Sequence, residues 1–218
     1  MFIKRALAFL VFAPLVRGQQ PEPVFKLHTP GMLGSGCPQG TAYAEVAADG
    51  QSISILFSNF AAETSDDGNR VRRACNLALP VQATPGVSIG FYKVDFRGYA
   101  YVPHVPLAYA SLTNEYFFAG QPRPITSKRF EPGTDEPIFE STEINVQSVI
   151  WSPCGGSTNF RINSAVVAYK PRDEQRNVQI QVDSIDGSVR GEVQVYVTYQ
   201  QCNETVAADE ATAAGQRG

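Results

Sequence analysis

The sequence predicts an all-β fold, an antiparallel β-sandwich or jelly roll with two disulfides, from three observations. About eight to ten short segments alternate apolar and polar residues with the period of two that strands have. β-Branched and aromatic residues are enriched in these segments, and Gly, Pro, Asn and Asp turn signals separate them. No stretch carries an apolar stripe at the helical period. A chain of 218 residues is long enough for one such domain, so we expect a single domain.

Residues 1–18 have the pattern of a secretory signal peptide. Two basic residues precede a short apolar run that Pro14 interrupts, and this run is too short to span a bilayer. We expect cleavage after Gly18, which makes Gln19 the mature N-terminus. No later hydrophobic stretch has the length of a membrane span or the pattern of a lipid-anchor signal. The sequence therefore predicts a secreted, extracellular protein without a membrane anchor.

The charge of the mature chain argues against a nucleic-acid partner. Cleavage removes Lys4, Arg5 and Arg17, so Lys+Arg falls from 18 to 15 while Asp+Glu stays at 21, and the formal charge changes from −3 to −6. Neutralisation of phosphates by Lys and Arg dominates nucleic-acid affinity, and the sequence shows no basic stripe. We expect no nucleic-acid binding.

Four cysteines, Cys37, Cys75, Cys154 and Cys202, predict two disulfides in an oxidising compartment. Of the three possible connectivities we favour Cys37–Cys75 with Cys154–Cys202, because each bond ties together the ends of one half of the chain. A zinc site would need closely spaced cysteine pairs, and the chain has none and only two His. We expect no metal and no other cofactor.

The predicted domain runs from residue 37 to residue 202. Residues 19–36 are rich in Pro and Gly and have no period, which is typical of an extended lead-in. Residues 203–218 are polar and alanine-rich, which is typical of a disordered tail. The tail begins with the sequon Asn203-Glu204-Thr205, so Asn203 is a candidate N-glycosylation site.

Two hairpins stand out. Residues 41–46 and 52–58 flank the turn signal Ala48-Asp49-Gly50, and residues 178–182 and 193–199 flank Asp186-Gly187. Between the hairpins, residues 63–73 look like a charged loop, and Pro80 marks an edge strand or a strand end. Residues 120–137 look like an irregular surface passage. We expect Trp151, the only Trp, to fill the core beside a disulfide.

The longest strand-like run, residues 87–102, supplies the candidate ligand face. Alternation places Asp95, Arg97, Tyr99 and Tyr101 on one side, opposite Tyr92, Val94 and Phe96, provided that Gly98 does not form a bulge that turns both tyrosines inward. Tyrosine rings stack on the apolar faces of sugars, and charged fork donors bind their hydroxyls. The competing interpretation is that the tyrosines pack internally and Arg97 pairs with Asp95.

Catalysis has weaker support than binding. A serine or cysteine hydrolase needs a base beside its nucleophile, and the only His residues are His28 and His104, in loops, with no nucleophile-elbow motif. Glycoside hydrolysis needs only two carboxylates on facing strands. The carboxylates on or beside predicted strands are Asp95, Asp183, Asp186 and Glu192. Of these, Asp183 and Glu192 would face each other in the second hairpin.

Five short motifs occur in order along the chain. They are Gly36-Cys37-Pro38, Arg73-Ala74-Cys75, Asp95-Phe-Arg-Gly-Tyr-Ala100, Trp151-Ser-Pro-Cys-Gly155 and Val182-Asp-Ser-Ile-Asp-Gly187. In this combination the chain resembles the secreted proteins of domain-of-unknown-function family 4360, which are largely fungal, over roughly residues 34–202. The resemblance implies a secreted, disulfide-containing β-protein. It implies no established activity, so it supplies no catalytic residues.

The sequence thus favours a non-enzymatic, secreted protein that acts at a cell wall or another surface, with carbohydrate binding as a candidate activity. Its partner would be a wall polysaccharide or a surface protein. Two alternatives stay open: a glycoside hydrolase that uses strand carboxylates, and a structural or effector-like protein that binds another protein.

Overall fold

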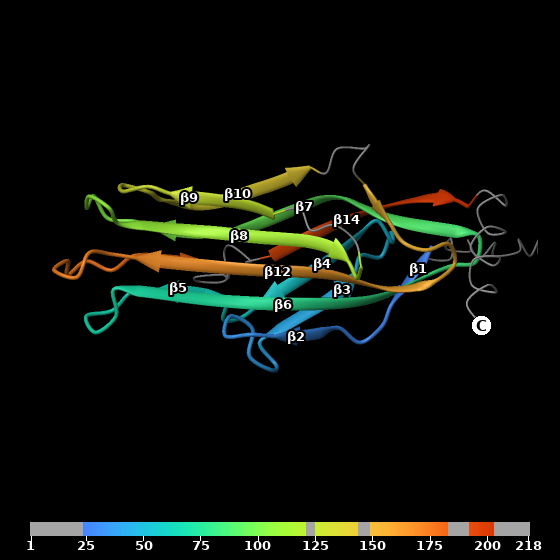
Figure 1. Ribbon diagram of the computed structural model, residues 1–218, viewed down its shortest axis with the longest axis horizontal. Helices are drawn as coiled ribbons and strands as arrows, with labels where there is room; N and C mark the ends of the chain where they lie inside the picture. The colour runs from blue at the N-terminus through green and yellow to red at the C-terminus, as the bar shows by residue number, and fades with distance from the viewer. Residues whose placement is uncertain (1–23, 121–124, 144–148, 183–191, 203–218) are drawn as a thin grey trace, which may run out of the picture.

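The computed structural model describes residues 24–120, 125–143, 149–182 and 192–202. In these ranges the chain forms strands β1 to β14 and no helix, so none that could cross a membrane. The strands build two antiparallel sheets that pack face to face, as Figure 1 shows, which confirms the predicted β-sandwich. The signal peptide, the Asn203 sequon, the tail, Asp183 and Asp186 lie outside the described residues.

The first sheet, called sheet A here, has six strands in the order β1-β6-β12-β8-β9, with β2 also on β6. Its strands are β1 (Phe25–Leu27), β2 (Gly31–Leu33), β6 (Arg70–Ala83), β8 (Tyr109–Phe118), β9 (Ile125–Phe130) and β12 (Ser157–Tyr169). The predicted lead-in thus contributes two short strands, because their backbone groups pair with the long strand β6.

The second sheet, sheet B, has eight strands around the central strand β7 (Val87–Tyr101). The others are β3 (Ala42–Val46), β4 (Ser52–Phe57), β5 (Ala61–Glu63), β10 (Asp135–Glu143), β11 (Ile150–Trp151), β13 (Gln179–Gln181) and β14 (Glu192–Gln201). Residues of β7 that pair with β14 or β13 on one side pair with β10 or β11 on the other. The sheet therefore ends in β10 and β11 on one side of β7, and in β3 and β5 on the other side.

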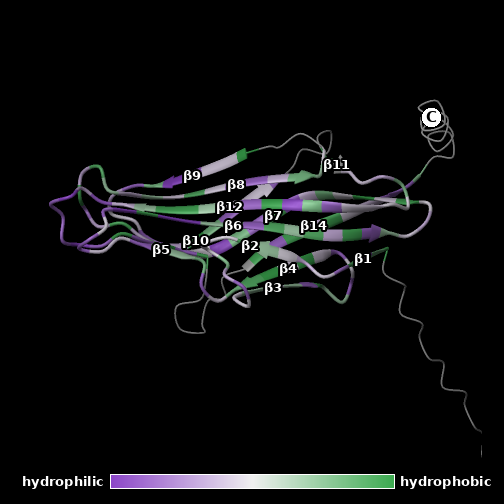
Figure 2. Ribbon diagram, turned by 60° about the horizontal axis from the view of Figure 1, so that its bottom comes forward, coloured by the Kyte–Doolittle hydropathy of each residue, from purple (hydrophilic) through white to green (hydrophobic). Residues whose placement is uncertain are grey.

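The core lies between the sheets and follows from the period of two. Figure 2 shows hydrophobic and hydrophilic residues alternating along the strands, and the hydrophobic set faces inward. Phe91 from sheet B stacks on Phe160 from sheet A with ring centroids 3.8 Å apart, and Phe118 lies 5.1 Å from Phe91. Burial of one such side chain contributes about 1.5–3 kcal/mol, so this aromatic cluster holds the two sheets together.

Both predicted disulfides are present and confirm the favoured connectivity. Cys37, in the connection from β2 to β3, bonds to Cys75 on β6, and both are fully buried. Cys154, between β11 and β12, bonds to Cys202 at the end of β14, and Cys154 is exposed. One crosslink is therefore part of the core and the other lies at the surface.

The first predicted hairpin is confirmed and the second is wrong. Strands β3 and β4 pair from Ala42 opposite Phe57 to Val46 opposite Ile53. Strands β13 and β14, in contrast, both pair antiparallel with β7, where Gln181 lies opposite Tyr99 and Val193 opposite Phe96. They occupy one strand position along β7, one after the other. The alternation of apolar and polar residues in both strands is compatible with pairing to β7 as well as with pairing to each other.

Strand β6 differs from the sequence prediction at two places. It begins at Arg70, inside the predicted charged loop, because β12 is long enough to pair with it there. Pro80 lies inside β6 and not at its end or on an edge strand. An amide nitrogen and the carbonyl of one residue point to the same side of a strand. The Pro80 carbonyl accepts the His28 amide at 2.8 Å, between β1 and β2, so the missing N–H falls where no ladder bond is needed.

The predicted irregular passage 120–137 is wrong for its described part, which contains β9 and the start of β10. Strand β9 pairs with β8 in sheet A, and β10 pairs with β7 in sheet B. A turn with Gly133 at φ 96° carries the chain from one sheet to the other. Lys128 and Glu140 form an ion pair of 3.1 Å across the two strands. The turn and the ion pair therefore link the two sheets along this edge of the sandwich.

Candidate ligand-binding face

Strand β7 carries Asp95, Arg97, Tyr99 and Tyr101 on the outer face of sheet B. The intervening residues Val94, Phe96, Gly98 and Ala100 are buried toward sheet A. The register of β7 with β10 and β13 is unbroken through Gly98, so neither tyrosine turns inward. A Cβ atom on Gly98 would lie 2.1 Å from the carbonyl oxygen of Gln181, so this position is glycine because the neighbouring backbone is close.

The bulge in β7 lies at Tyr92 instead. Tyr196 of β14 pairs with Lys93, and the next residue, Val197, pairs with Phe91, which leaves Tyr92 as the extra residue. The extra residue turns Tyr92 outward, where it is 38% exposed. The prediction that Tyr92 shares the core face of Val94 is therefore wrong, and the outer face gains an aromatic ring next to Tyr196.

Asp95 is on the outer face but is 2% exposed, and it is held by neighbours on three strands. Its Oδ2 atom accepts a hydrogen bond from the Tyr196 hydroxyl at 2.9 Å. The same atom forms an ion pair with Lys93 Nζ at 3.1 Å. Burial raises the pKa of Asp95, but hydrogen bonds from Ser141, Lys93 and Tyr196 outweigh this and hold the pKa below its usual value. Asp95 therefore positions its neighbours.

The cation partner of Asp95 is Lys93, so the internal Arg97–Asp95 pair considered from the sequence does not form. The Arg97 guanidinium is exposed and lies 5.5 Å from the ring centroid of Phe139, its cross-strand partner on β10. Phe139 is 56% exposed. The sequence analysis did not place this ring on the ligand face, because it assigned residues up to Pro137 to an irregular passage. The buried Ile138 and the exposed Phe139 nevertheless alternate as a half-buried strand requires.

Tyr99 and Tyr101 continue the face toward the end of β7. Both rings are half-buried, and Asp135 of β10 lies directly opposite Tyr101. The Tyr99 hydroxyl donates a hydrogen bond to the Asp135 carboxylate, and this bond raises the pKa of Tyr99. On the other side of the strand Gln179 and Gln181 of β13 face the same two tyrosines. Rings, amides and one guanidinium thus lie next to one another across three strands.

Trp151 also lies on the outer face of sheet B and not in the core, so that prediction is wrong. It pairs with Gly90 of β7, between the inward-facing Ile89 and Phe91. A Cβ on Gly90 would come 3.0 Å from the Trp151 ring, which shows that the ring covers this glycine. Trp151 is half-buried.

The other predicted candidates do not assemble into a catalytic site in the described part of the chain. The Asp95 carboxylate is bound by Tyr196 and Lys93. Glu192 begins β14 opposite Leu56, and its side chain is outside the described residues. His104 packs its ring against Gly133. Among the described residues no group of three His, Cys, Asp or Glu side chains is close enough to hold a metal.

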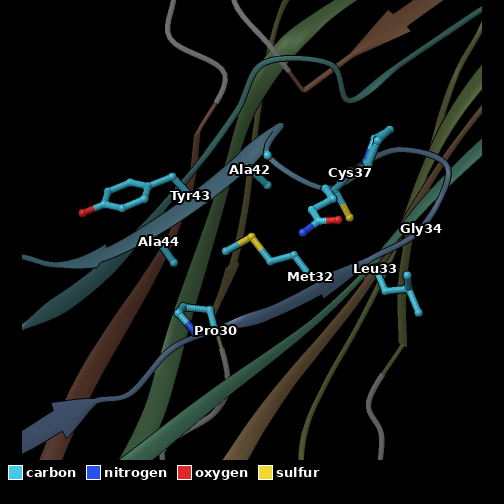
Figure 3. Close-up of a pocket in the computed structure, with 11 residues that line it drawn as sticks. Pro30, Met32, Leu33, Gly34, Cys37, Ala42, Tyr43 and Ala44 are labelled. Atoms are coloured by element: carbon cyan, nitrogen blue, oxygen red, sulfur yellow. The ribbon is translucent and has the colours of Figure 1, made fainter.

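A hollow of about 510 Å³ lies between β2 and β3. Figure 3 shows Met32 pointing into the gap between the two strands, whereas the Tyr43 ring points away from it. Small side chains, Ala42 and Ala44, form the opposite wall. This hollow offers apolar contacts and lacks the guanidinium and tyrosine pairs of the β7 face.

Comparison with known proteins shows the family to which the chain belongs. Residues 25–202 match the family described as a domain of unknown function, DUF4360. An uncharacterized secreted protein of Arthroderma benhamiae is 29% identical over 190 residues, which are 85% of this chain and 75% of that protein. This relative confirms the prediction of secretion.

Two solved structures match the chain at low identity and low TM-score. The carbohydrate-binding module TmCBM61, solved with β-1,4-galactotriose, is 10% identical with a TM-score of 0.33, over 78% of this chain and 88% of that chain. The 7S globulin of Momordica charantia is 13% identical with a TM-score of 0.16, over 81% of this chain and 39% of that chain. The match over residues 25–202, together with the motif order found in the sequence, identifies the chain as a member of the DUF4360 family.

Proposed function

We propose that this secreted protein binds a cell-wall carbohydrate, without chemistry, on the outer face of sheet B. The observation that carries the proposal is the exposed Phe139 ring beside the Arg97 guanidinium, continued by Tyr99 and Tyr101. Aromatic rings present apolar faces to sugar C–H groups, and a guanidinium fork donates to ring and hydroxyl oxygens. Tyr99 is already oriented by Asp135, so its ring loses little conformational freedom on binding.

The rigid backbone under these side chains supports the same function. Strand β7 is paired on both sides along this stretch, with β10 on one side and with β13 and β14 on the other. Side chains on a central strand keep their spacing, about 6.7 Å between alternate residues such as Tyr99 and Tyr101. A row of rings on the face of a sheet suits an extended polysaccharide chain better than it suits a small ligand, which binds in an enclosed pocket.

The test is a pull-down of the mature protein with insoluble chitin, β-glucan and cellulose, with an assay for sugar released into the supernatant. Phe139→Ala and Tyr101→Ala should each weaken binding to the bound polymer by about tenfold, because each removes a stacking surface. Tyr43→Ala is the matched control, since Tyr43 is an exposed aromatic residue, 61% accessible, on the distant strand β3.

Three outcomes would contradict the proposal. Absence of binding to all three polymers would favour a protein partner. Equal losses for Phe139→Ala and Tyr43→Ala would indicate unspecific adhesion of aromatic side chains. Release of soluble sugar would replace the binding function by hydrolysis.

A further inference from the structure

We propose that the outer face of sheet A is a second, separate site, which binds an acidic polysaccharide through Arg70, Arg72 and Arg129 around the ring pair Tyr109–Tyr169. This site lies on the opposite side of the sandwich from the β7 face. Figure 1 shows its strands β6, β12, β8 and β9 side by side in one layer.

The pairing register brings these residues together. Arg70 lies opposite Tyr169, and Tyr169 lies opposite Tyr109, so the three form one row across β6, β12 and β8. The next outward-facing row along the strands contains Arg72, Val167, Ser111 and Arg129. Cross-strand partners share a face of the sheet, and the residues between these rows, such as Ala168 and Ala110, are buried. Both rows therefore point to solvent.

The outer face of sheet A is basic in a chain that is acidic overall. Outward positions on its four long strands carry the arginines Arg70, Arg72, Arg129 and Arg161. Glu115 is the one carboxylate among the same outward positions, and Asn163 donates a hydrogen bond to it at 3.0 Å. The whole chain has a formal charge of −3. The fold gathers these arginines from three distant segments, so no basic stripe is visible in the sequence.

The rings of Tyr109 and Tyr169 lie between the arginines on this face. The two ring centroids are 5.2 Å apart with 30° between the planes, and the Arg129 guanidinium carbon lies 3.7 Å from the Tyr109 centroid. Arg129 Nε donates to Glu131 at 2.9 Å, which uses one of its five N–H donors. Arg70 and Arg72 are exposed and form no ion pair with a described carboxylate.

The spacing indicates a polymer with repeated carboxylates. The backbones at Arg72 and Arg129 stand three strand spacings apart, about 14 Å, so the row is longer than one small anion. Guanidinium groups bind carboxylates through two parallel hydrogen bonds, and tyrosine rings pack against sugar faces. A uronic acid polymer offers both features at intervals along one chain. Nucleic acid is the weaker fit, because its affinity depends on many cations and the chain carries an excess of carboxylates.

The test measures binding of the mature protein to soluble polygalacturonate by calorimetry at fixed ionic strength. Replacement of both Arg70 and Arg72 by Gln should weaken binding at least about tenfold, and Tyr169→Ala should also weaken it. The matched control replaces Lys26 and Arg161 by Gln, which removes the same charge from the same face but from its other end. That control should retain most of the affinity.

Two further ligands sharpen the result. Methyl-esterified polygalacturonate has the same rings without charged carboxylates and should bind poorly, as should double-stranded DNA. Equal losses for the two double variants, or equal binding of the esterified polymer or DNA, would overturn the proposal. Phe139→Ala should leave polygalacturonate binding unchanged, and the Arg70/Arg72 variant should still bind neutral polymers, so failure of one site is distinguishable from failure of the other.

Discussion

The Tyr196 hydroxyl on β14 donates a 2.9 Å hydrogen bond to the buried carboxylate of Asp95 on β7. Lys93 completes the arrangement, with its ammonium 3.1 Å from the same carboxylate oxygen and 4.7 Å from the Tyr196 ring centroid. This three-residue network fixes the outer face of sheet B next to the Tyr92 bulge. It explains how a strand can carry an acid on its outer side and still keep that acid out of water.

Loss of the Asp95 carboxylate should destabilise the protein. Asp95→Ala leaves the Tyr196 hydroxyl and the Lys93 ammonium without their shared acceptor, and we expect the free energy of unfolding to fall by about 1–3 kcal/mol. Urea unfolding followed by tryptophan fluorescence measures this. Asp135→Ala, an exposed carboxylate on the neighbouring strand, should change stability by less than about 0.5 kcal/mol. Equal effects of the two variants would show that the network contributes nothing.

Stability should also fall in acid through this group. Hydrogen bonds from Ser141, Lys93 and Tyr196 outweigh burial and hold the pKa of Asp95 below its unfolded value of about 3.9. The unfolded chain therefore binds the proton first as the pH falls, so the contribution of Asp95 is fully present above about pH 4 and is lost as the pH falls through the lower folded pKa. Unfolding curves of wild type and Asp95→Asn between pH 2 and pH 6 should converge at the acid end. Parallel curves would contradict this assignment.

The two disulfides should differ in their reactivity toward reductants. Cys37 and Cys75 are fully buried, whereas Cys154 is exposed, so a thiolate reaches only the Cys154–Cys202 bond in the folded protein. Brief treatment with low reductant, followed by alkylation and mass spectrometry, should label Cys154 and Cys202 first. Removal of either bond should cost about 2–5 kcal/mol of stability. Simultaneous labelling of all four cysteines would mean that reduction follows global unfolding.

Gly98 should tolerate no side chain. A Cβ there would lie 2.1 Å from the Gln181 carbonyl oxygen, so Gly98→Ala must separate β7 from β13, and we expect a loss of about 1–3 kcal/mol. Gly31→Ala is the control, because its Cβ would lie at 3.6 Å from Ala78, an ordinary contact. Thermal unfolding of both variants tests the difference, and similar midpoints would contradict the close approach.

Much of the fold follows from local sequence patterns, and the exceptions share a physical cause. The β3–β4 hairpin and both disulfides were predictable because a turn signal and an even set of cysteines constrain neighbours directly. The β13–β14 hairpin failed because alternation specifies a buried face and not a partner. The start of β6 was missed because its pairing with β12 brings a charged segment into a sheet.

The candidate face was predictable only in part. Alternation put Asp95, Arg97, Tyr99 and Tyr101 on one side of β7, but it did not reveal that Asp95 is buried by Tyr196 from a strand a hundred residues away. Phe139 and Trp151 reach the same sheet face through pairing with β7, and such long-range register is absent from a single sequence. The basic face of sheet A is hidden for the same reason.

Strands β13 and β14 lie one after the other along the same side of β7, so the length of the connection between them does not determine their pairing. Each of the two strands is held by its own bonds to β7, and on the other side to β5 and β4 respectively. Insertions or deletions between residues 182 and 192 therefore leave the register of both strands unchanged. The position of each strand on the β7 face is thus set by its own neighbours and not by the length of the connection between the two strands.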